Sequence, residues 1–485
     1  MTLAEPPLPP DACYLALKAR DARFDGTFFT GVTSTGIYCR PVCRVRTPRR
    51  ENCRFFAHAA QAESAGFRPC LRCWPELAPQ ALRWSLQDAA SVLALQAARL
   101  LDEPEAWADG PPSVERLAAR LGVSDRHLRR IFEAQLGVTP LQYLQTRRLL
   151  TAKQLLADTD LPITHVAHAS GFASVRRFNA AFLAHYGLNP SQLRRHGTPR
   201  EAGCEVRLGF RPPYDVAAML GFFRTRAIAG MERVDDLSLA RTLALQGHVG
   251  WLQATLDAGH CQLLLRTSDS LRPVLPLLIR RVRSAFDLDA DPQAINSRLH
   301  GSFPAGDGLR VPGALSGYEL AVRAVLGQQV TVAAARTLAQ RLVQRFGSPV
   351  TTPWPELGFL FPPPEVLAAA EGDALGQLGI VRQRQAAIVA IARAVRDGAL
   401  QLHAGADVPA TVAALTALPG IGDWTAQYIA MRALRWPDAF PAGDVALHKA
   451  LGVQRSRQAA REAEAASQAW KPWRSYAVVR AWSAL

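Results

Sequence analysis

Residues 35–43 read Thr-Gly-Ile-Tyr-Cys-Arg-Pro-Val-Cys, and residues 66–73 read Gly-Phe-Arg-Pro-Cys-Leu-Arg-Cys. These stretches carry a Cys-x3-Cys pair and a Cys-x2-Cys pair, formed by Cys39, Cys43, Cys70 and Cys73. The 26 residues between the pairs are enough for both turns to close on one ion. Four thiolates at this spacing suit tetrahedral Zn²⁺, which favours sulfur ligands. The pattern therefore predicts a small zinc domain.

The spacing leaves the role of the zinc open. A four-cysteine site usually does no more than stabilise a small domain. The residues around these cysteines, however, resemble the zinc domain of the Ada family, in which one zinc thiolate is a nucleophile. The resemblance implies that Cys39 accepts a methyl group from a DNA methyl phosphotriester, although spacing alone cannot select it from the four cysteines.

Charge supports such a reaction. Zinc with four thiolates carries a net charge of about −2, which repels a phosphodiester but not a neutral methyl phosphotriester. Methylation would reduce this charge and strengthen DNA binding, as a one-way switch. Three arginines near the cysteines are candidates to hold the flanking phosphates: Arg40, Arg46 and Arg72.

The composition favours a polyanionic partner. The chain has 485 residues, with 56 Lys and Arg against 41 Asp and Glu, a formal net charge of +15. This excess indicates double-stranded DNA, although genome composition explains part of it. No stretch approaches the ~20 apolar residues of a membrane span, and the N-terminus lacks signal-peptide features. We therefore expect a bacterial cytoplasmic, nucleoid-associated protein without a membrane partner. Its thiols are then reduced, and the unpaired cysteines (Cys13, Cys53, Cys204 and Cys261) are expected to be buried or incidental.

A helix-turn-helix pattern occurs twice between residues 113 and 196. Ser113 and Ser124 can cap two short helices around Gly122, and Ser174 caps the second helix of a similar pair that begins at Ile163. A long amphipathic stretch over 140–156 separates the pairs. The candidate DNA contacts on the second helices are Arg126, Arg129, Arg130, Arg176 and Arg177, although any one of them could equally belong to a solvated basic face.

This region resembles the AraC-type DNA-binding domain along its full length. Residues 171–174 (Gly-Phe-Ala-Ser) and 187–190 (Gly-Leu-Asn-Pro), together with Arg194, match the tail motif of that family. The resemblance implies binding to promoter sites and contact with RNA polymerase. Ala180 stands where many members carry a basic residue, which predicts a weaker phosphate contact by that helix.

Two motifs mark the C-terminal part. Residues 418–422 read Leu-Pro-Gly-Ile-Gly, a turn in which Gly420 and Gly422 can present N–H groups to a phosphate. Residues 440–444 read Phe-Pro-Ala-Gly-Asp and begin another helix. Taken separately, the first is a turn and Asp444 is an N-cap. Together they resemble the helix-hairpin-helix DNA glycosylase superfamily, in which that cap is also the catalytic carboxylate.

Residues 214–223, 317–328 and 472–477 narrow the resemblance to the AlkA family of 3-methyladenine glycosylases. It implies hydrolytic release of alkylated bases with Asp444 stabilising the oxocarbenium-like sugar. The expected substrate-binding residues are Trp424, Tyr428, Trp482, Gln328 and Gln329, of which the aromatic three could equally be core. Bifunctional relatives carry Lys at position 424, so Trp424 implies no strand cleavage. Two departures are Gln329, in place of an apolar wedge, and Val445, in place of an aromatic residue.

We therefore expect a multidomain chain with two linkers, over 102–112 and 196–203. A small α/β zinc domain over 1–85 precedes an all-α double helix-turn-helix domain over 86–197. An α+β domain over 204–300 then leads into an all-α helix-hairpin-helix glycosylase domain over 301–485. The Pro-Cys-His-Arg motif of the Ada methylguanine-transferase domain is absent.

The predicted function is a combined methyl sensor, promoter-binding module and base-excision glycosylase, with Zn²⁺ as cofactor. Two alternatives remain. The chain could be a transcription regulator with structural zinc and a catalytically inactive C-terminal DNA-binding domain. Alternatively, structural zinc could belong to a module that only tethers an active enzyme to DNA.

Overall fold

The computed structural model describes residues 8–79, 89–103, 107, 110–195, 204–370 and 373–485. The predicted linker over 196–203 lies outside the described residues, as does part of the linker over 102–112. The chain forms two compact units. The first contains Met1–Pro212, Asp257–Leu277 and Leu288–Asp291, and the second contains Pro213–Leu256, Leu278–Asp287 and Pro292–Leu485.

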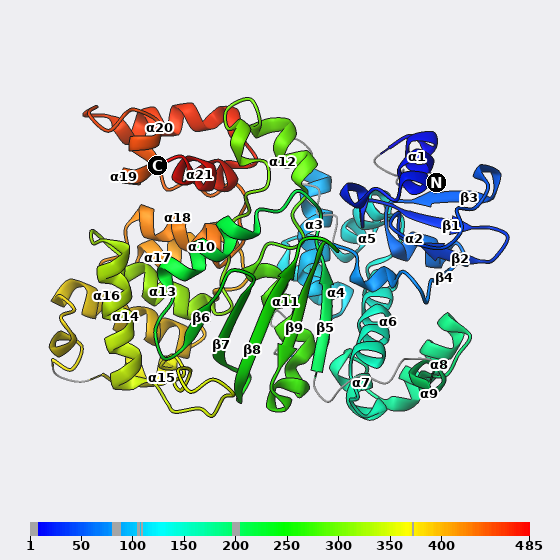
Figure 1. Cartoon of the computed structure of the whole chain (residues 1–485), viewed down its shortest axis with the longest axis horizontal. Coiled ribbons are helices and arrows are strands. Elements are labelled where there is room, and N and C mark those ends of the chain that lie inside the picture. Colours follow the sequence, from blue (N-terminus) through cyan, green and yellow to red (C-terminus); the bar gives the residue numbers. More distant parts are fainter. Residues whose placement is uncertain (1–7, 80–88, 104–106, 108–109, 196–203, 371–372) are drawn as a thin grey trace. The chain divides into compact units, whose positions relative to one another are not determined.

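The first unit begins with a small α/β structure (blue in Figure 1). Its elements are α1 (Pro10–Ala19), β1 (Phe29–Val32), β2 (Ile37–Cys39), β3 (Cys53–Phe56), α2 (Ala59–Ser64) and β4 (Arg68–Pro69). The sheet order is β3-β1-β2-β4, in which only β2 and β4 are parallel. An aromatic core of Phe29, Tyr38, Phe56 and Phe67 supports the sheet. The sheet therefore holds the two cysteine pairs, because β2 ends at Cys39 and β4 ends just before Cys70.

Seven helices follow among the described residues: α3 (Ala89–Asp102), α4 (Val114–Arg120), α5 (Asp125–Leu136), α6 (Pro140–Asp158), α7 (Ile163–Ala169), α8 (Val175–Tyr186) and α9 (Pro190–Arg195). The predicted caps are confirmed. The hydroxyl oxygens of Ser113, Ser124 and Ser174 accept hydrogen bonds from the N–H groups of Arg116, His127 and Arg177 at 3.2, 3.3 and 3.3 Å. Both helix-turn-helix pairs are present, with α6 between them.

Helix α6 is anchored on the cysteine loop by a buried charge. The Lys153 ammonium donates to the Cys70 carbonyl oxygen at 2.9 Å and to the Glu76 carboxylate at 2.8 Å. It also lies 4.6 Å from the centre of the Trp74 ring. Neither side chain of the ion pair is more than 2% exposed. Burial raises the pKa of Glu76 despite the opposing effect of the Lys153 ammonium. The predicted amphipathic helix over 140–156 is thus more closely tied to the zinc ligands than its sequence indicates.

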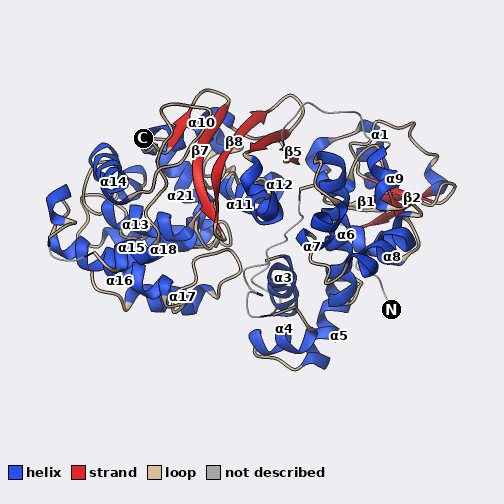
Figure 2. Ribbon diagram, turned by 90° about the horizontal axis from the view of Figure 1, so that it is seen from below, coloured by secondary structure: helices blue, strands red, loops and turns tan. Residues whose placement is uncertain are grey.

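The strands after residue 204 confirm the predicted strands at 249–254 and 261–266. In the first unit, β5 (Cys204–Gly209) pairs antiparallel with β9 (Gln262–Thr267). In the second unit, β7 (Ser238–Leu245) pairs antiparallel with β6 (Glu232–Val234) and β8 (His248–Asp257). Strands β7 and β8 run side by side (red in Figure 2).

The second unit is otherwise helical. Its described helices are α10 (Val216–Arg226), α11 (Leu275–Ala285, which begins in the first unit), α12 (Pro292–Leu299), α13 (Gly317–Leu326), α14 (Val332–Phe346), α15 (Pro364–Ala368), α16 (Arg382–Arg396), α17 (Val408–Thr416), α18 (Asp423–Arg432), α19 (Val445–Ala450), α20 (Ala459–Ser467) and α21 (Arg474–Ser483). The predicted hairpin joins α17 to α18. Gly420 has φ +75°, and a Cβ there would lie 3.3 Å from both the Gln383 carbonyl oxygen and the Ala387 methyl, so glycine is required.

No described helix is both long and apolar enough to cross a membrane.

We expect Lys153→Met to destabilise the first unit by about 3–5 kcal/mol, because it leaves the Glu76 carboxylate buried without its cation. Urea unfolding followed by metal release to a chromogenic chelator measures this loss. Lys18→Met, at an exposed lysine, is the matched control and should change stability by less than about 0.5 kcal/mol. The double variant Lys153→Met/Glu76→Gln should recover part of the loss. An unchanged unfolding curve for Lys153→Met would contradict an anchoring role.

Candidate functional site

The four predicted zinc ligands come together. The sulfur atoms of Cys39, Cys43, Cys70 and Cys73 all lie within 4.8 Å of one another. Tetrahedral Zn²⁺ with bonds of about 2.3 Å separates its sulfur ligands by about 3.8 Å, so this cluster fits the ion. Two backbone N–H groups point at sulfur, from Arg72 to Cys70 and from Arg40 to Cys73, both at 3.4 Å. Such donors stabilise thiolates.

Exposure does not favour Cys39 over the other three thiolates as a nucleophile. Cys39 is 6% exposed, much like Cys43 and Cys70 at 4% and 6%, and Cys73 is half-buried. Among the other cysteines, Cys13 is buried, and burial raises its pKa to about 11. It therefore remains a neutral thiol and is neither a ligand nor a nucleophile.

The three arginines near the zinc ligands differ in their surroundings. Arg46 and Arg72 are exposed. Arg40 is buried: its Nε donates to Asp25 Oδ1 at 2.8 Å and its Nη1 donates to the Cys73 carbonyl oxygen at 3.0 Å. Its buried guanidinium supports the loop that carries Cys73, so we leave Arg40 out of the proposed DNA-binding set.

The predicted DNA-contacting arginines on α5 and α8 are all exposed: Arg126, Arg129, Arg130, Arg176 and Arg177. Two of them make surface contacts. Arg129 lies 3.4 Å from the Glu115 carboxylate, and Arg130 lies 3.2 Å from a ring nitrogen of His127. Surface contacts of this kind contribute little to stability, so these side chains can turn to a phosphate or base. Ala180, the expected departure, is exposed on α8.

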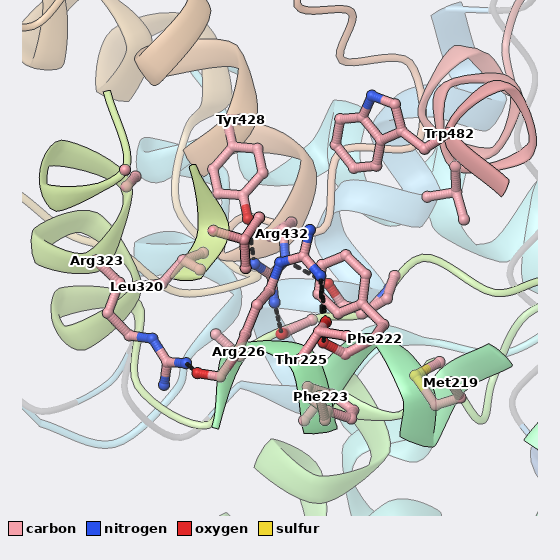
Figure 3. Close-up of a pocket in the computed structure, with 18 of the residues that line it drawn as sticks. Met219, Phe222, Phe223, Thr225, Arg226, Leu320, Arg323, Tyr428, Arg432 and Trp482 are labelled. Carbon is pink, nitrogen blue, oxygen red and sulfur yellow. Dashed lines mark hydrogen bonds between the residues drawn. The ribbon is translucent and has the colours of Figure 1, made fainter. Parts of the chain in front are cut away.

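The second unit contains a cavity of about 720 Å³, which lies within the size range of ligand sites. Its walls come from α10, α13, α14, α18, α19 and α21. Trp424, Tyr428, Trp482 and Asp444 all line it, as the sequence predicted for a base-binding pocket. Figure 3 shows Tyr428 and Trp482 on neighbouring walls.

Asp444 is held by three donors. Its Oδ1 accepts the Leu447 backbone N–H at 2.7 Å, as the N-cap of α19, and the Trp482 indole N–H at 3.0 Å. Its Oδ2 accepts the Trp424 indole N–H at 2.9 Å. Both oxygens act only as acceptors, which is the pattern of an ionised carboxylate. The side chain is thus fixed at the edge of the cavity, 9% exposed.

The three aromatic rings lie together, and two of them serve a second purpose that the sequence did not indicate. Trp424 and Tyr428 are stacked with ring centres 5.3 Å apart and planes 13° apart. The Trp482 ring centre lies 6.3 Å from that of Tyr428. The three predicted aromatic residues therefore form one cluster on the cavity wall, and the two indoles also orient the carboxylate.

The two glutamines do not line the cavity. Gln328 Nε2 donates to the Gly420 carbonyl oxygen at 2.9 Å and to Thr425 Oγ1 at 3.0 Å, so this side chain braces the hairpin. Gln329 is exposed with φ +52°, a left-handed conformation at the surface. Gly420 is half-buried within the hairpin, and Gly422 is the exposed N-cap of α18.

The lining residues that sequence reasoning missed include Phe222, Arg226 and Arg432. Arg432 donates through Nη1 to the Tyr428 hydroxyl, and through Nε and Nη2 to the carbonyl oxygens of Pro312 and Gly313 at 2.7 and 3.1 Å. A signal for it existed, because positions 424, 428 and 432 repeat every four residues and so share one face of α18. Burial lowers the pKa of Arg432.

Four protein families match consecutive parts of the chain. The metal binding domain of Ada matches residues 12–76, and a helix-turn-helix domain matches 117–196. The AlkA N-terminal domain matches 205–316, and the HhH-GPD superfamily of base excision DNA repair proteins matches 322–475. A probable bifunctional transcriptional activator/DNA repair enzyme AlkA of Mycobacterium tuberculosis is 38% identical over 98% of this chain and 96% of its own length.

The chain belongs to the AlkA family of bifunctional transcriptional activator/DNA repair enzymes.

Two further relatives match the two halves of this AlkA-family chain. DNA-3-methyladenine glycosylase 2 of Escherichia coli is 37% identical over 57% of this chain and 95% of its own length. The bifunctional transcriptional activator/DNA repair enzyme Ada of Escherichia coli is 35% identical over 39% of this chain and 49% of its own length. With the four-cysteine cluster, these matches confirm the expected Zn²⁺ cofactor, the multidomain fold class and DNA as the partner.

The zinc assignment predicts one Zn²⁺ per chain, measured by inductively coupled plasma mass spectrometry after extensive dialysis. Cys70→Ser should lower this content well below one, since a hydroxyl is a poor zinc ligand. Cys13→Ser is the matched control at another buried cysteine and should retain the metal. Full zinc content in Cys70→Ser would remove this thiolate from the ligand set.

Proposed function

We propose that the C-terminal half hydrolyses the N-glycosidic bond of alkylated bases such as 3-methyladenine, as a monofunctional DNA glycosylase. The observation that carries this proposal is the Asp444 carboxylate, fixed by three donors at the edge of an aromatic cavity. The likeness to the Escherichia coli DNA-3-methyladenine glycosylase 2 supports it. The site contains what such a reaction needs: a pocket for a flat base and one oriented anion.

The reaction begins with base flipping, because the bond to be cleaved is inaccessible within a stacked duplex. The base stacks against the aromatic surface that Trp424, Tyr428 and Trp482 present to the cavity. As the C1′–N bond breaks, the electron pair leaves with the base and positive charge develops on the sugar. Asp444 stabilises that charge and orients the water that attacks C1′. Trp424 offers no amine for a Schiff base, so the strand remains intact.

We propose a second activity for the N-terminal part, in which Cys39 accepts a methyl group from a DNA methyl phosphotriester. A carbon–sulfur bond forms, the carbon–oxygen bond of the methyl ester breaks, and the phosphodiester leaves with the electron pair. Each chain reacts once. The likeness to the Escherichia coli activator Ada supports this proposal, as does the zinc cluster of four thiolates.

Methylation changes one thiolate into a neutral thioether, which makes the cluster less negative and the DNA less repelled. The two helix-turn-helix pairs then hold promoter DNA through α5 and α8. At the promoter, RNA polymerase is the protein partner that such an activator contacts. We propose that the protein acts on the nucleoid, in the bacterial cytoplasm. The rival function, a regulator with an inactive C-terminal domain, predicts no base release at all.

Asp444→Asn should reduce release of methylated bases by at least about 100-fold, because the amide cannot stabilise the cationic sugar. Single-turnover release from methylated DNA, followed by chromatography, measures this rate. Binding to DNA that contains an abasic-site analogue should be retained, which separates lost chemistry from lost folding. Undiminished release in Asp444→Asn would refute the proposed role of the carboxylate.

Cys39→Ser should prevent methyl transfer from phosphotriesters, while the wild-type chain gains one methyl on Cys39. Peptide mass spectrometry after incubation with methylated DNA locates the group. Cys53→Ser, at a buried cysteine outside the cluster, is the control and should still accept the methyl. A methyl on Cys43, Cys70 or Cys73 would show that the acceptor assignment is wrong.

A further inference from the structure

The exposed side of α19 begins beside the Asp444 carboxylate. Asp444 caps this helix, and Val445, the next residue, is 77% exposed, the most exposed of the large apolar side chains described. Lys449 is also exposed and follows Val445 by four residues, so the two lie on the same side of α19. Leu447 lies on the opposite side and is fully buried. One side of α19 is therefore open to solvent from its first turn to its last.

The loop that follows α19 adds two arginines to this side of the unit. It joins α19 to α20 over residues 451–458 and carries Arg455 and Arg457, which are both exposed. The Ser456 hydroxyl between them donates to the Glu462 carboxylate at 2.5 Å and accepts a backbone N–H of the loop at 3.1 Å. Both arginines are thus presented from a turn that hydrogen bonds hold in place.

The charge of this segment is one-sided. Residues 445–461 contain one lysine, three arginines and no acidic residue. None of these four cations forms an ion pair within the described part of the chain. The acidic groups of α20 are engaged elsewhere, since Glu462 accepts the Ser456 hydroxyl and Glu464 lies 2.9 Å from Arg474. A single exposed cation is commonly just solvated, but a run of them without counter-charge favours an external anion.

The position of the reacting carboxylate indicates which anion lies there. Asp444 must meet C1′ of the flipped nucleotide, so the backbone of the damaged strand passes the first turn of α19. Lys449 follows Val445 by about 6 Å along the helix axis, which corresponds to about two nucleotide steps of one strand. Phosphates next to the flipped nucleotide are therefore within reach of this lysine and of the loop behind it.

We propose that Lys449, Arg455 and Arg457, here called the basic surface, bind phosphates of the damaged strand that flank the flipped nucleotide. This contact is separate from the hairpin over 418–422. The inference rests on the proposed glycosylase function, because the contact of Asp444 with C1′ sets the position of the strand. Ammonium and guanidinium groups bind phosphodiesters through charge-assisted hydrogen bonds. Such contacts position the DNA without reading its sequence, which suits an enzyme that acts wherever a lesion occurs.

The first test measures binding of the full chain to a duplex that contains one abasic-site analogue, between about 50 and 200 mM salt. Each phosphate contact contributes about −0.9 to the slope of log K against log salt concentration. We expect the triple variant Lys449→Met/Arg455→Met/Arg457→Met to make this slope less steep by about 2 to 3. Arg345→Met is the matched control. This exposed arginine of α14 lies outside the cavity lining, and its loss should leave the slope unchanged.

The second test locates the contacted phosphates by removing their charge. Methylphosphonates replace the phosphates nearest to the analogue, one at a time. In the wild-type chain, a neutral linkage at a contacted position should weaken binding by about 10-fold. In the triple variant the same linkage should cost little, because its cation is already gone. A general effect of the three substitutions on folding would not depend on the position of the neutral linkage.

Base release gives a third measurement. Because the basic surface touches no reacting atom, the triple variant should need more protein for half-maximal release of methylated bases but reach the wild-type single-turnover rate at saturation. An unchanged salt slope in the triple variant would overturn the inference, as would the wild-type pattern of methylphosphonate losses. Absence of base release by the wild-type chain would instead refute the proposed glycosylase function, since binding to the analogue requires no chemistry.

Discussion

The base pocket depends on the three hydrogen bonds that the Asp444 carboxylate accepts. It joins the N-terminus of α19 to the side chains of Trp424 on α18 and Trp482 on α21. A hydrogen bond to a charged group contributes about 1.5–3 kcal/mol. This one carboxylate therefore fixes three helix segments and two aromatic walls at once. A change that moves this carboxylate therefore alters both the shape of the pocket and the proposed chemistry.

In the first unit, too, one charged side chain holds several groups in place. Lys153 neutralises Glu76 and also binds the carbonyl oxygen of the zinc ligand Cys70. Buried ion pairs rarely add stability over apolar side chains, but they specify one arrangement, because any other leaves a buried charge unpaired. This contact therefore fixes α6, which lies between the two helix-turn-helix pairs, against the loop that carries Cys70.

Much of this could be predicted from the sequence, because the signals were local. Cysteine spacing, serine caps and the Pro-Gly-x-Gly turn depend on residues close together in the chain, and each was found where it was expected. The buried partnerships were not local. Arg40 reads as a basic residue beside a metal site, yet it pairs with Asp25, 15 residues earlier. Lys153 pairs with Glu76, which lies 77 residues away in the sequence, and no periodic pattern predicts a contact at that separation.

The two arginines in the pocket alter the attraction that its aromatic rings have for a positively charged base. An aromatic box attracts a cationic base by about 0.5–2 kcal/mol through cation–π contact. A guanidinium about 6 Å from the same base opposes its charge by about 3 kcal/mol at an effective dielectric of ~20. Arg226 and Arg432 both line this cavity. The repulsion from even one such guanidinium exceeds the cation–π attraction, so the positive charge of a ring does not by itself favour its entry into this cavity.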